Sequence, residues 1–187
     1  MELLEAFDKA LAEFDGRVHQ VEDRQWDATT PCTKWTVRDL VNHLTAEHLW
    51  APSLLDGATL EEVGDRFEGD VLDGDPVRSW ERAAAESRLA FHRAGALDGQ
   101  VHTSGGPTPA REYGWQMTMD LTVHAWDLAR GIGVEDVIDK DLAQAVYDRF
   151  APEVSRWQGL GIFDPPVEVS ESADTQDRLV ALLGRRP

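Results

Sequence analysis

The segment Met117–Arg130 carries ionisable side chains inside an apolar helical stripe. Apolar residues recur with the period of an α-helix at Met117, Leu121 and Leu128, and at Tyr113 one turn before the segment. Asp120 and His124 fall in the same stripe, and because they are four residues apart their side chains project the same way. Burying a carboxylate and an imidazole is costly unless a partner satisfies both. The segment therefore predicts a helix packed into a helical core, with a polar site where this pair points.

The sequence leaves two interpretations of the Asp120–His124 pair open. A divalent metal would satisfy both groups at once, and an i,i+4 pair is a common way for a helix to bind one. Alternatively, the two side chains hydrogen-bond each other or a neighbouring helix. Asp127 lies on the same broad side of the helix, where it orients His124 or another ligand, or else pairs with Arg130 at a rim.

A second segment, residues 37–55, shows the same mixture of apolar and ionisable residues. His43 and Glu47 again form an i,i+4 pair beside the apolar stripe. His48 falls nearer the middle of that stripe than His43 does. Helical periodicity alone therefore does not decide which histidine supplies the third ligand that a metal would require.

Glycine, proline and capping residues divide the chain into helices and breaks. Long helices are predicted at residues 2–24, 37–55, 76–95, 110–131 and 140–157, with short ones at 60–67 and 175–183. The expected N-caps are Thr36, Asp75, Thr108, Asp139 and Asp174. Strand patterns are almost absent, and residues 163–169 are expected to form an extended strap. We predict an all-α four-helix bundle with long connections, plus the strap and an extra C-terminal helix (about 160–187), in one domain spanning 1–187.

Composition narrows the classes of partner and of site. The chain has 35 acidic and 18 basic residues, a formal net charge of -17, which argues against a nucleic-acid or anionic-membrane partner. Cys32 is the single cysteine, so an intramolecular disulfide and thiolate-rich zinc sites are excluded, and any metal site must use nitrogen and oxygen ligands. Residues 1–14 resemble neither a signal peptide nor a membrane span, and we expect a cytoplasmic protein.

Three segments carry a family resemblance. Trp35–His43, with the sequence WTVRDLVNH, resembles the segment that holds the first metal-binding histidine of DinB-like four-helix bundles. His124–Ala129, HAWDLA, resembles the H-x-W-D-L-A segment of the mycothiol-dependent maleylpyruvate isomerase N-terminal domain. Pro165–Arg185 resembles the C-terminus of a compact, mostly uncharacterised actinobacterial branch of this group. The resemblance covers nearly the whole chain.

This resemblance implies a divalent metal held by His43, Asp120 and His124, and so favours His43 over His48. The isomerases have a glutamate at the position of Asp120. Since aspartate is one methylene shorter, the metal would lie closer to this helix or be reached through water. Three nitrogen and oxygen ligands leave an open position on Zn²⁺, the expected ion, with Ni²⁺, Fe²⁺ or Mn²⁺ as alternatives.

The functional hypothesis that follows is a metal-dependent enzyme that uses a mycothiol-type thiol in a transferase or isomerase-like reaction on an unassigned small substrate. Glu47 is the candidate general base or additional ligand, and Asp127 orients a ligand. Metal-dependent hydrolysis is the nearest variant. The alternatives are a non-catalytic metal-binding stress-response module, monomeric or homodimeric, and a metal-free structural bundle. The isomerases have a further C-terminal domain that helps hold mycothiol, so maleylpyruvate isomerisation itself is not carried over.

Overall fold

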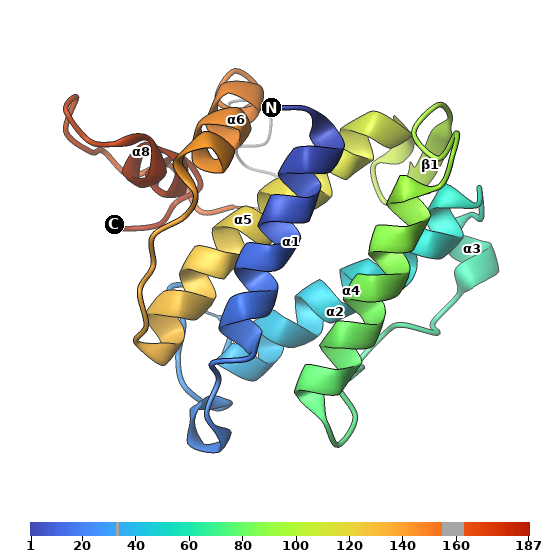
Figure 1. Cartoon of the computed structure of the whole chain (residues 1–187), viewed down its shortest axis with the longest axis horizontal. Coiled ribbons are helices and arrows are strands. Elements are labelled where there is room, and N and C mark those ends of the chain that lie inside the picture. The colour runs from blue at the N-terminus through green and yellow to red at the C-terminus, as the bar shows by residue number, and fades with distance from the viewer. Residues whose placement is uncertain (33, 155–162) are drawn as a thin grey trace.

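Four long helices form a bundle in the computed structural model, which describes residues 1–32, 34–154 and 163–187 (Figure 1). They are α1 (Leu3–Val18), α2 (Val37–Leu55), α4 (Pro76–His92) and α5 (Ala110–Ile132). Helix α1 packs against α5 and α4, and α2 packs against the same two helices. The predicted helical bundle is therefore confirmed, with α1 and α2 at opposite corners.

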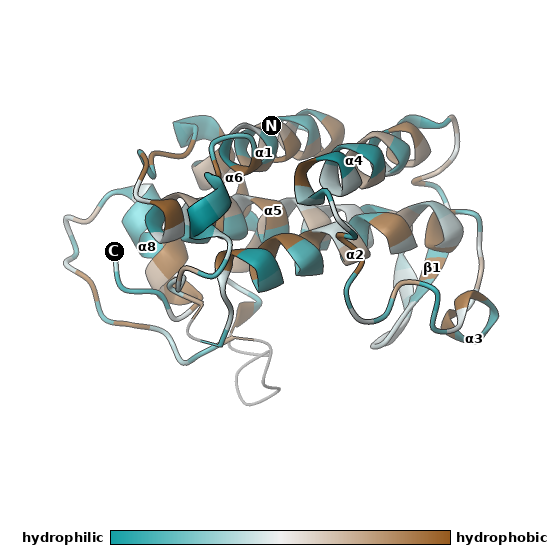
Figure 2. Cartoon of the chain, turned by 90° about the horizontal axis from the view of Figure 1, so that it is seen from below, coloured by the Kyte–Doolittle hydropathy of each residue, from teal (hydrophilic) through white to brown (hydrophobic). Residues whose placement is uncertain are grey.

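The helices assemble because each has one apolar side. Figure 2 shows hydrophilic and hydrophobic residues on different sides of the same helices. The largest fully buried side chains in the bundle include Phe7, Phe14, Leu40, Leu44, Trp80, Phe91, Leu121 and Trp126. Burying one such side chain contributes about 1.5–3 kcal/mol, so these residues supply the main drive for packing. Among the helices that the structure describes, none combines the length and apolarity needed to cross a bilayer.

Local capping fixes the bounds of α2 as predicted. The Thr36 side chain accepts a hydrogen bond from the Asp39 backbone N–H, and the Asp39 carboxylate accepts one from the Thr36 N–H at 2.9 Å. This reciprocal pair satisfies two of the backbone donors that a helix N-terminus leaves free. Because the start of α2 is fixed, the direction in which His43 projects is fixed as well.

Several predicted helices are shorter in the structure. Helix α1 ends at Val18, and residues Asp23–Gln25 form a separate 3₁₀ turn, η1, so the predicted single helix over 2–24 is wrong. Helix α3 covers only Leu60–Val63, because Gly64 follows with a φ of 66°. Helix α4 ends at His92 instead of reaching residue 95.

Residues 100–109, predicted to lack strands, form a hairpin. Strands β1 (Gln100–Thr103) and β2 (Gly106–Pro109) pair antiparallel. Thr108, expected to cap the following helix, lies instead in β2, where its Oγ1 is 3.1 Å from Oγ1 of Thr103. Strands this short contain too few residues to show alternation in sequence. Gly106, with a φ of 99°, supplies the turn between them.

Two further helices lie beside the bundle. Helix α6 (Lys140–Phe150) contacts α5, α1 and α8 (Thr175–Leu182). The expected N-caps of α6 and α8 are confirmed: Asp139 accepts from the Leu142 N–H, and Asp174 from the Asp177 N–H. The predicted end of α6 at residue 157 is wrong, since the helix ends at Phe150, and Trp157 lies outside the described residues. Residues 164–170 belong to neither a helix nor a strand.

His48 lies in the core of the bundle instead of in a polar site. Its ring is fully buried, with its centroid 5.2 Å from that of Trp80 and 6.0 Å from that of Phe7. Neither ring nitrogen has a hydrogen-bond partner among the described residues. Burial lowers the pKa of His48 to about 3, so this histidine is neutral in the folded protein at neutral pH.

Replacing His48 with leucine should reduce the loss of stability in acid. The unfolded chain binds a proton at His48 below a pH of about 6.5, whereas the folded chain does so only near its depressed pKa of about 3. Folding at pH 5 is therefore opposed by about 2 kcal/mol that is absent at pH 7.5. Urea unfolding at both pH values should show that penalty in the wild type but not in His48→Leu.

His102→Leu is the matched control, because it makes the same change at a histidine that is half-buried outside the bundle core. His48→Leu should also raise the free energy of unfolding at pH 7.5 by about 1 kcal/mol, since it removes an unsatisfied buried donor. An unchanged pH dependence in His48→Leu would contradict the buried neutral histidine.

Candidate metal centre

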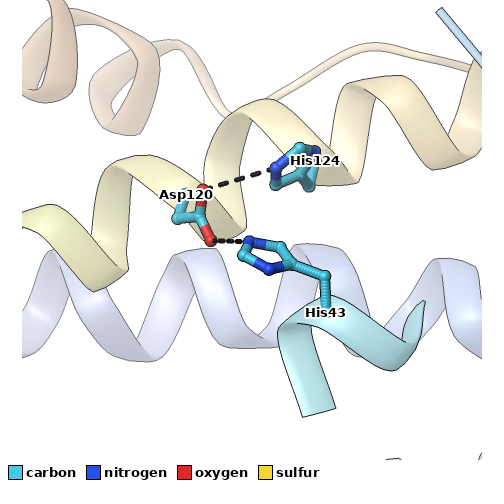
Figure 3. Close-up of side chains that lie close together, drawn as sticks. All are labelled: His43, Asp120 and His124. Atoms are coloured by element: carbon cyan, nitrogen blue, oxygen red, sulfur yellow. Dashed lines mark hydrogen bonds and ion pairs between the residues drawn. The ribbon is translucent and has the colours of Figure 1, made fainter. Parts of the chain in front are cut away.

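Three of the sequence-predicted site residues meet where α2 and α5 pack together (Figure 3). His43 Nε2 donates a hydrogen bond to Asp120 Oδ2 at 3.0 Å, and His124 Nε2 lies 3.3 Å from Asp120 Oδ1. One ligand atom from each of these residues lies within 4.8 Å of the other two. The Asp120 carboxylate thus lies between the imidazoles, and α2 contributes His43 to this cluster while His48 points into the core.

The charges of the cluster reinforce one another. Burial by itself would raise the pKa of Asp120, but the charges and hydrogen bonds of His124 and His43 lower it well below its ordinary value. Burial would likewise lower the pKa of His124, yet Asp120 and Asp127 raise it to about 9. Without a metal, the cluster is therefore a carboxylate that holds an adjacent imidazolium.

Trp35 covers one side of the cluster. Its ring centroid lies 4.7 Å from that of His43 and 5.5 Å from that of His124. The residues just before α2 place this indole, because the Trp35 carbonyl accepts hydrogen bonds from Thr30. The contact restricts both imidazoles to few rotamers and keeps this side of the site apolar.

Asp127 contacts His124 from the side away from Asp120. His124 Nδ1 donates to Asp127 Oδ2 at 2.9 Å, and the Asp127 side chain is completely buried. The alternative pairing of Asp127 with Arg130 does not occur, since Arg130 pairs with Asp136. The second partner of Asp127 is Arg185, whose Nη2 donates to Oδ2 at 2.8 Å.

Arg185 is the residue of this site that our sequence reasoning missed. It follows Asp127 by 58 positions, and no helical spacing connects the two. The available signal was Gly184, a helix-ending glycine placed directly before an arginine in the C-terminal motif. That signal indicates a turn but does not say which helix the turn faces.

A cavity of about 1050 Å³ opens onto the cluster. Besides the three clustered residues, it is lined by Glu47, Trp50, Tyr113, Met117 and Glu68, among others. Glu47 faces this cavity but is not one of the three residues whose ligand atoms converge. Burial raises the pKa of Glu47, which brings its carboxyl closer to the range where it exchanges protons at neutral pH.

Cys32 does not behave as an activated nucleophile. The thiol is half-buried, and burial is the main cause that raises its pKa. A raised pKa lowers the thiolate fraction, and thiolate is the reactive form. Cys32 is therefore better described as a small packing residue than as a nucleophile.

The donor set suits a divalent metal. Two imidazole nitrogens and a carboxylate oxygen are borderline ligands of the kind that Zn²⁺ and its neighbours accept. The ordered Asp127 contact on His124 is the arrangement that metal-ligating histidines usually have. The same three residues also satisfy one another by hydrogen bonds and ion pairing, which is the structural alternative raised by the sequence.

Comparison with known proteins agrees with the resemblance seen in the motifs. The family described as the mycothiol maleylpyruvate isomerase N-terminal domain matches residues 7–129. The chain belongs to this family. Two uncharacterized proteins from two strains of Mycobacterium tuberculosis are 27% identical over 147 residues, which covers 76% of this chain and 74% of theirs.

Most of the chain shares its fold with solved structures. The crystal structures of the mycothiol-dependent maleylpyruvate isomerase and of a mutant match with a TM-score of 0.66. Their sequence identities are 19% and 18%, so the likeness concerns the fold. The match covers 91% of this chain and 77% of the isomerase chains. His43, Asp120 and His124 lie within the family's matched range, whereas Arg185 lies beyond it.

His124 should titrate far above an ordinary histidine in metal-free protein. Its pKa of about 9 depends on Asp120 and Asp127, so Asp120→Asn should lower that pKa by about 1–3 units, the usual effect of one close opposite charge. NMR titration of chelator-treated protein would measure both values. A wild-type His124 that titrates near pH 6.5 would contradict the buried ion pair.

Proposed function

We propose that the protein binds one divalent metal ion through His43, Asp120 and His124, with Zn²⁺ the expected ion and Ni²⁺, Fe²⁺ or Mn²⁺ as alternatives. The observation that carries this proposal is the convergence of three ligand atoms from two helices within 4.8 Å. His43 and Asp120 are separated by 77 positions in the sequence. Their proximity therefore comes from the packing of two helices and not from local structure. Membership of the mycothiol maleylpyruvate isomerase N-terminal family supports the same assignment.

Each residue of the site has a distinct task in this proposal. Asp127 accepts from His124 Nδ1, which leaves Nε2 of that ring facing the cluster. Asp120 supplies the negative charge, and Trp35 limits how far the imidazoles can turn. When bound, a divalent ion supplies Lewis acidity that favours the deprotonated form of a thiol or of water.

We further propose that the ligand is a thiol of the mycothiol type, and that the reaction is isomerase-like or a thiol transfer. The cavity beside the cluster has room for a small-molecule ligand. Glu47 lies on this cavity, one helical turn after His43, where it can accept the thiol proton. Burial raises its pKa, which makes this carboxylate a stronger proton acceptor than an exposed glutamate.

Two other functions use the same residues. Metal-dependent hydrolysis requires water in place of the thiol, and a non-catalytic metal-binding stress-response module requires no substrate. The cavity with the Glu47 carboxyl on its wall favours an enzyme over the non-catalytic module. We treat residues 1–187 as one functional unit, because α6 and α8 pack together beside the bundle and Arg185 reaches Asp127.

Protein purified without an affinity tag should contain about one divalent metal ion per chain, as expected of a single three-ligand site. His124→Ala and His43→Ala should each lose that metal, because either change removes one of three ligands. Elemental mass spectrometry would measure the content. His92→Ala is the matched control, since His92 pairs with Asp8 on the surface between α1 and α4.

The outcomes of this metal analysis separate the hypotheses. Metal retained in His124→Ala would place the ligands elsewhere. Wild-type protein that takes up no metal, even after addition of zinc, nickel or manganese, would contradict the metalloenzyme proposal and leave the hydrogen-bonded structural cluster.

A thiol should bind to the metal-loaded protein but not to chelator-treated protein, because the metal favours the thiolate form. Titration calorimetry with mycothiol as the probe would measure this difference. Glu47→Gln should weaken thiol binding about tenfold while retaining the metal, since it removes a charged hydrogen-bond acceptor. Glu68→Gln, the same change elsewhere on the cavity, should have little effect. Equal thiol binding with and without metal would contradict the thiol assignment.

A further inference from the structure

Arg185 is a buried cation fixed at both ends of its guanidinium group. Its side chain is 8% exposed, and the Asp127 side chain that it contacts is 0% exposed. Nη2 donates to Asp127 Oδ2 at 2.8 Å, and Nε lies 3.3 Å from both carboxylate oxygens. Nη1 donates to the Leu183 carbonyl at 2.8 Å. This fork-shaped contact defines both the position and the rotation of the carboxylate.

The turn after α8 directs Arg185 toward α5. Gly184 has a φ of 87°, and its N–H donates to the Ala181 carbonyl at 3.0 Å. The Arg185 N–H donates to the Val180 carbonyl at 2.9 Å, which closes the end of the helix. A Cβ at position 184 would lie 2.6 Å from Cβ of Asp164, so only glycine fits between this turn and the strap.

These contacts form a continuous chain of side chains from the C-terminal segment to the cluster. Arg185 contacts Asp127, Asp127 contacts His124 Nδ1, and His124 Nε2 faces Asp120. Asp127 and Arg185 are both buried, so solvent screens these contacts little. Arg185 lies outside residues 7–129, the part matched by the family.

We infer that Arg185 is a positioning residue for His124: by fixing Asp127, the C-terminal segment sets how tightly the site retains its metal. This inference rests on the proposed function. Without Arg185, the Asp127 carboxylate keeps its contact with His124 but loses the contacts that define its position and rotation. His124 Nδ1 then faces an acceptor that is no longer fixed, so the orientation of the ring is less well defined.

The test compares zinc affinity, by competition with a chelator, in full-length wild type and three variants. Arg185→Gln should weaken zinc binding about tenfold, the lower end of the range for residues that orient a ligand. Arg185→Lys, which keeps the charge but loses the fork, should recover part of that loss. Arg186→Gln removes the same charge from the exposed neighbouring residue and should match the wild type.

A second measurement distinguishes positioning from a general loss of stability. In the Asp127→Asn background, Arg185→Gln should cause no further loss of affinity, because Arg185 acts through Asp127. The visible spectrum of the cobalt-substituted protein should change in Arg185→Gln and not in Arg186→Gln. If Arg185→Gln does not fold, Arg185→Lys carries the test with a smaller loss in the same direction.

The inference would be overturned if Arg185→Gln bound zinc as tightly as the wild type or more tightly. If Arg185→Gln does not fold, the same outcome in Arg185→Lys would overturn it. Tighter binding would mean that Arg185 only repels the metal through space. Wild-type protein that binds none of zinc, nickel, iron or manganese would instead overturn the proposed function, together with this inference, so the two failures are distinguishable.

Discussion

Asp120 lies in the packed interface of two helices with one imidazole on each side, and this burial of charge governs the rest of the site. A carboxylate at that depth is unfavourable alone, because the protein interior solvates it poorly. His43 and His124 offset that cost and lower the pKa of Asp120, while Asp120 and Asp127 raise the pKa of His124. The interaction requires α2 and α5 to pack in one register, so the cluster and the bundle depend on each other.

The part of the chain that follows α5 does more than pack beside the bundle, because it also supplies a residue of the site. Helices α6 and α8 contact each other, and the turn at Gly184 brings Arg185 against Asp127. The buried ionisable groups around His124 thus come from α5 and from the C-terminal segment. Arg185 gives the buried Asp127 carboxylate a second charged partner besides His124, and a buried charge is less unfavourable when it is paired.

A shared fold at low sequence identity is weak evidence for a shared reaction. The fold is shared with the mycothiol-dependent maleylpyruvate isomerase at a TM-score of 0.66, yet identity is at most 19%. At that distance, similar helices can support different reactions, and function depends on the residues of the site. Here the site consists of a histidine–carboxylate cluster and a cavity of about 1050 Å³, with the Glu47 carboxyl on the cavity wall.

The sequence by itself determined the long helices and the candidate ligands, because helical periodicity and caps such as Thr36 and Asp139 act within a few residues. It did not determine the hairpin at 100–109, whose strands are too short to show a pattern. Periodicity also left His43 and His48 equivalent, and the family resemblance favoured His43. Only tertiary packing separated them, since α2 turns one ring toward Asp120 and the other toward Trp80. Arg185 was decided by tertiary structure as well, because a contact across 58 positions depends on where the chain returns.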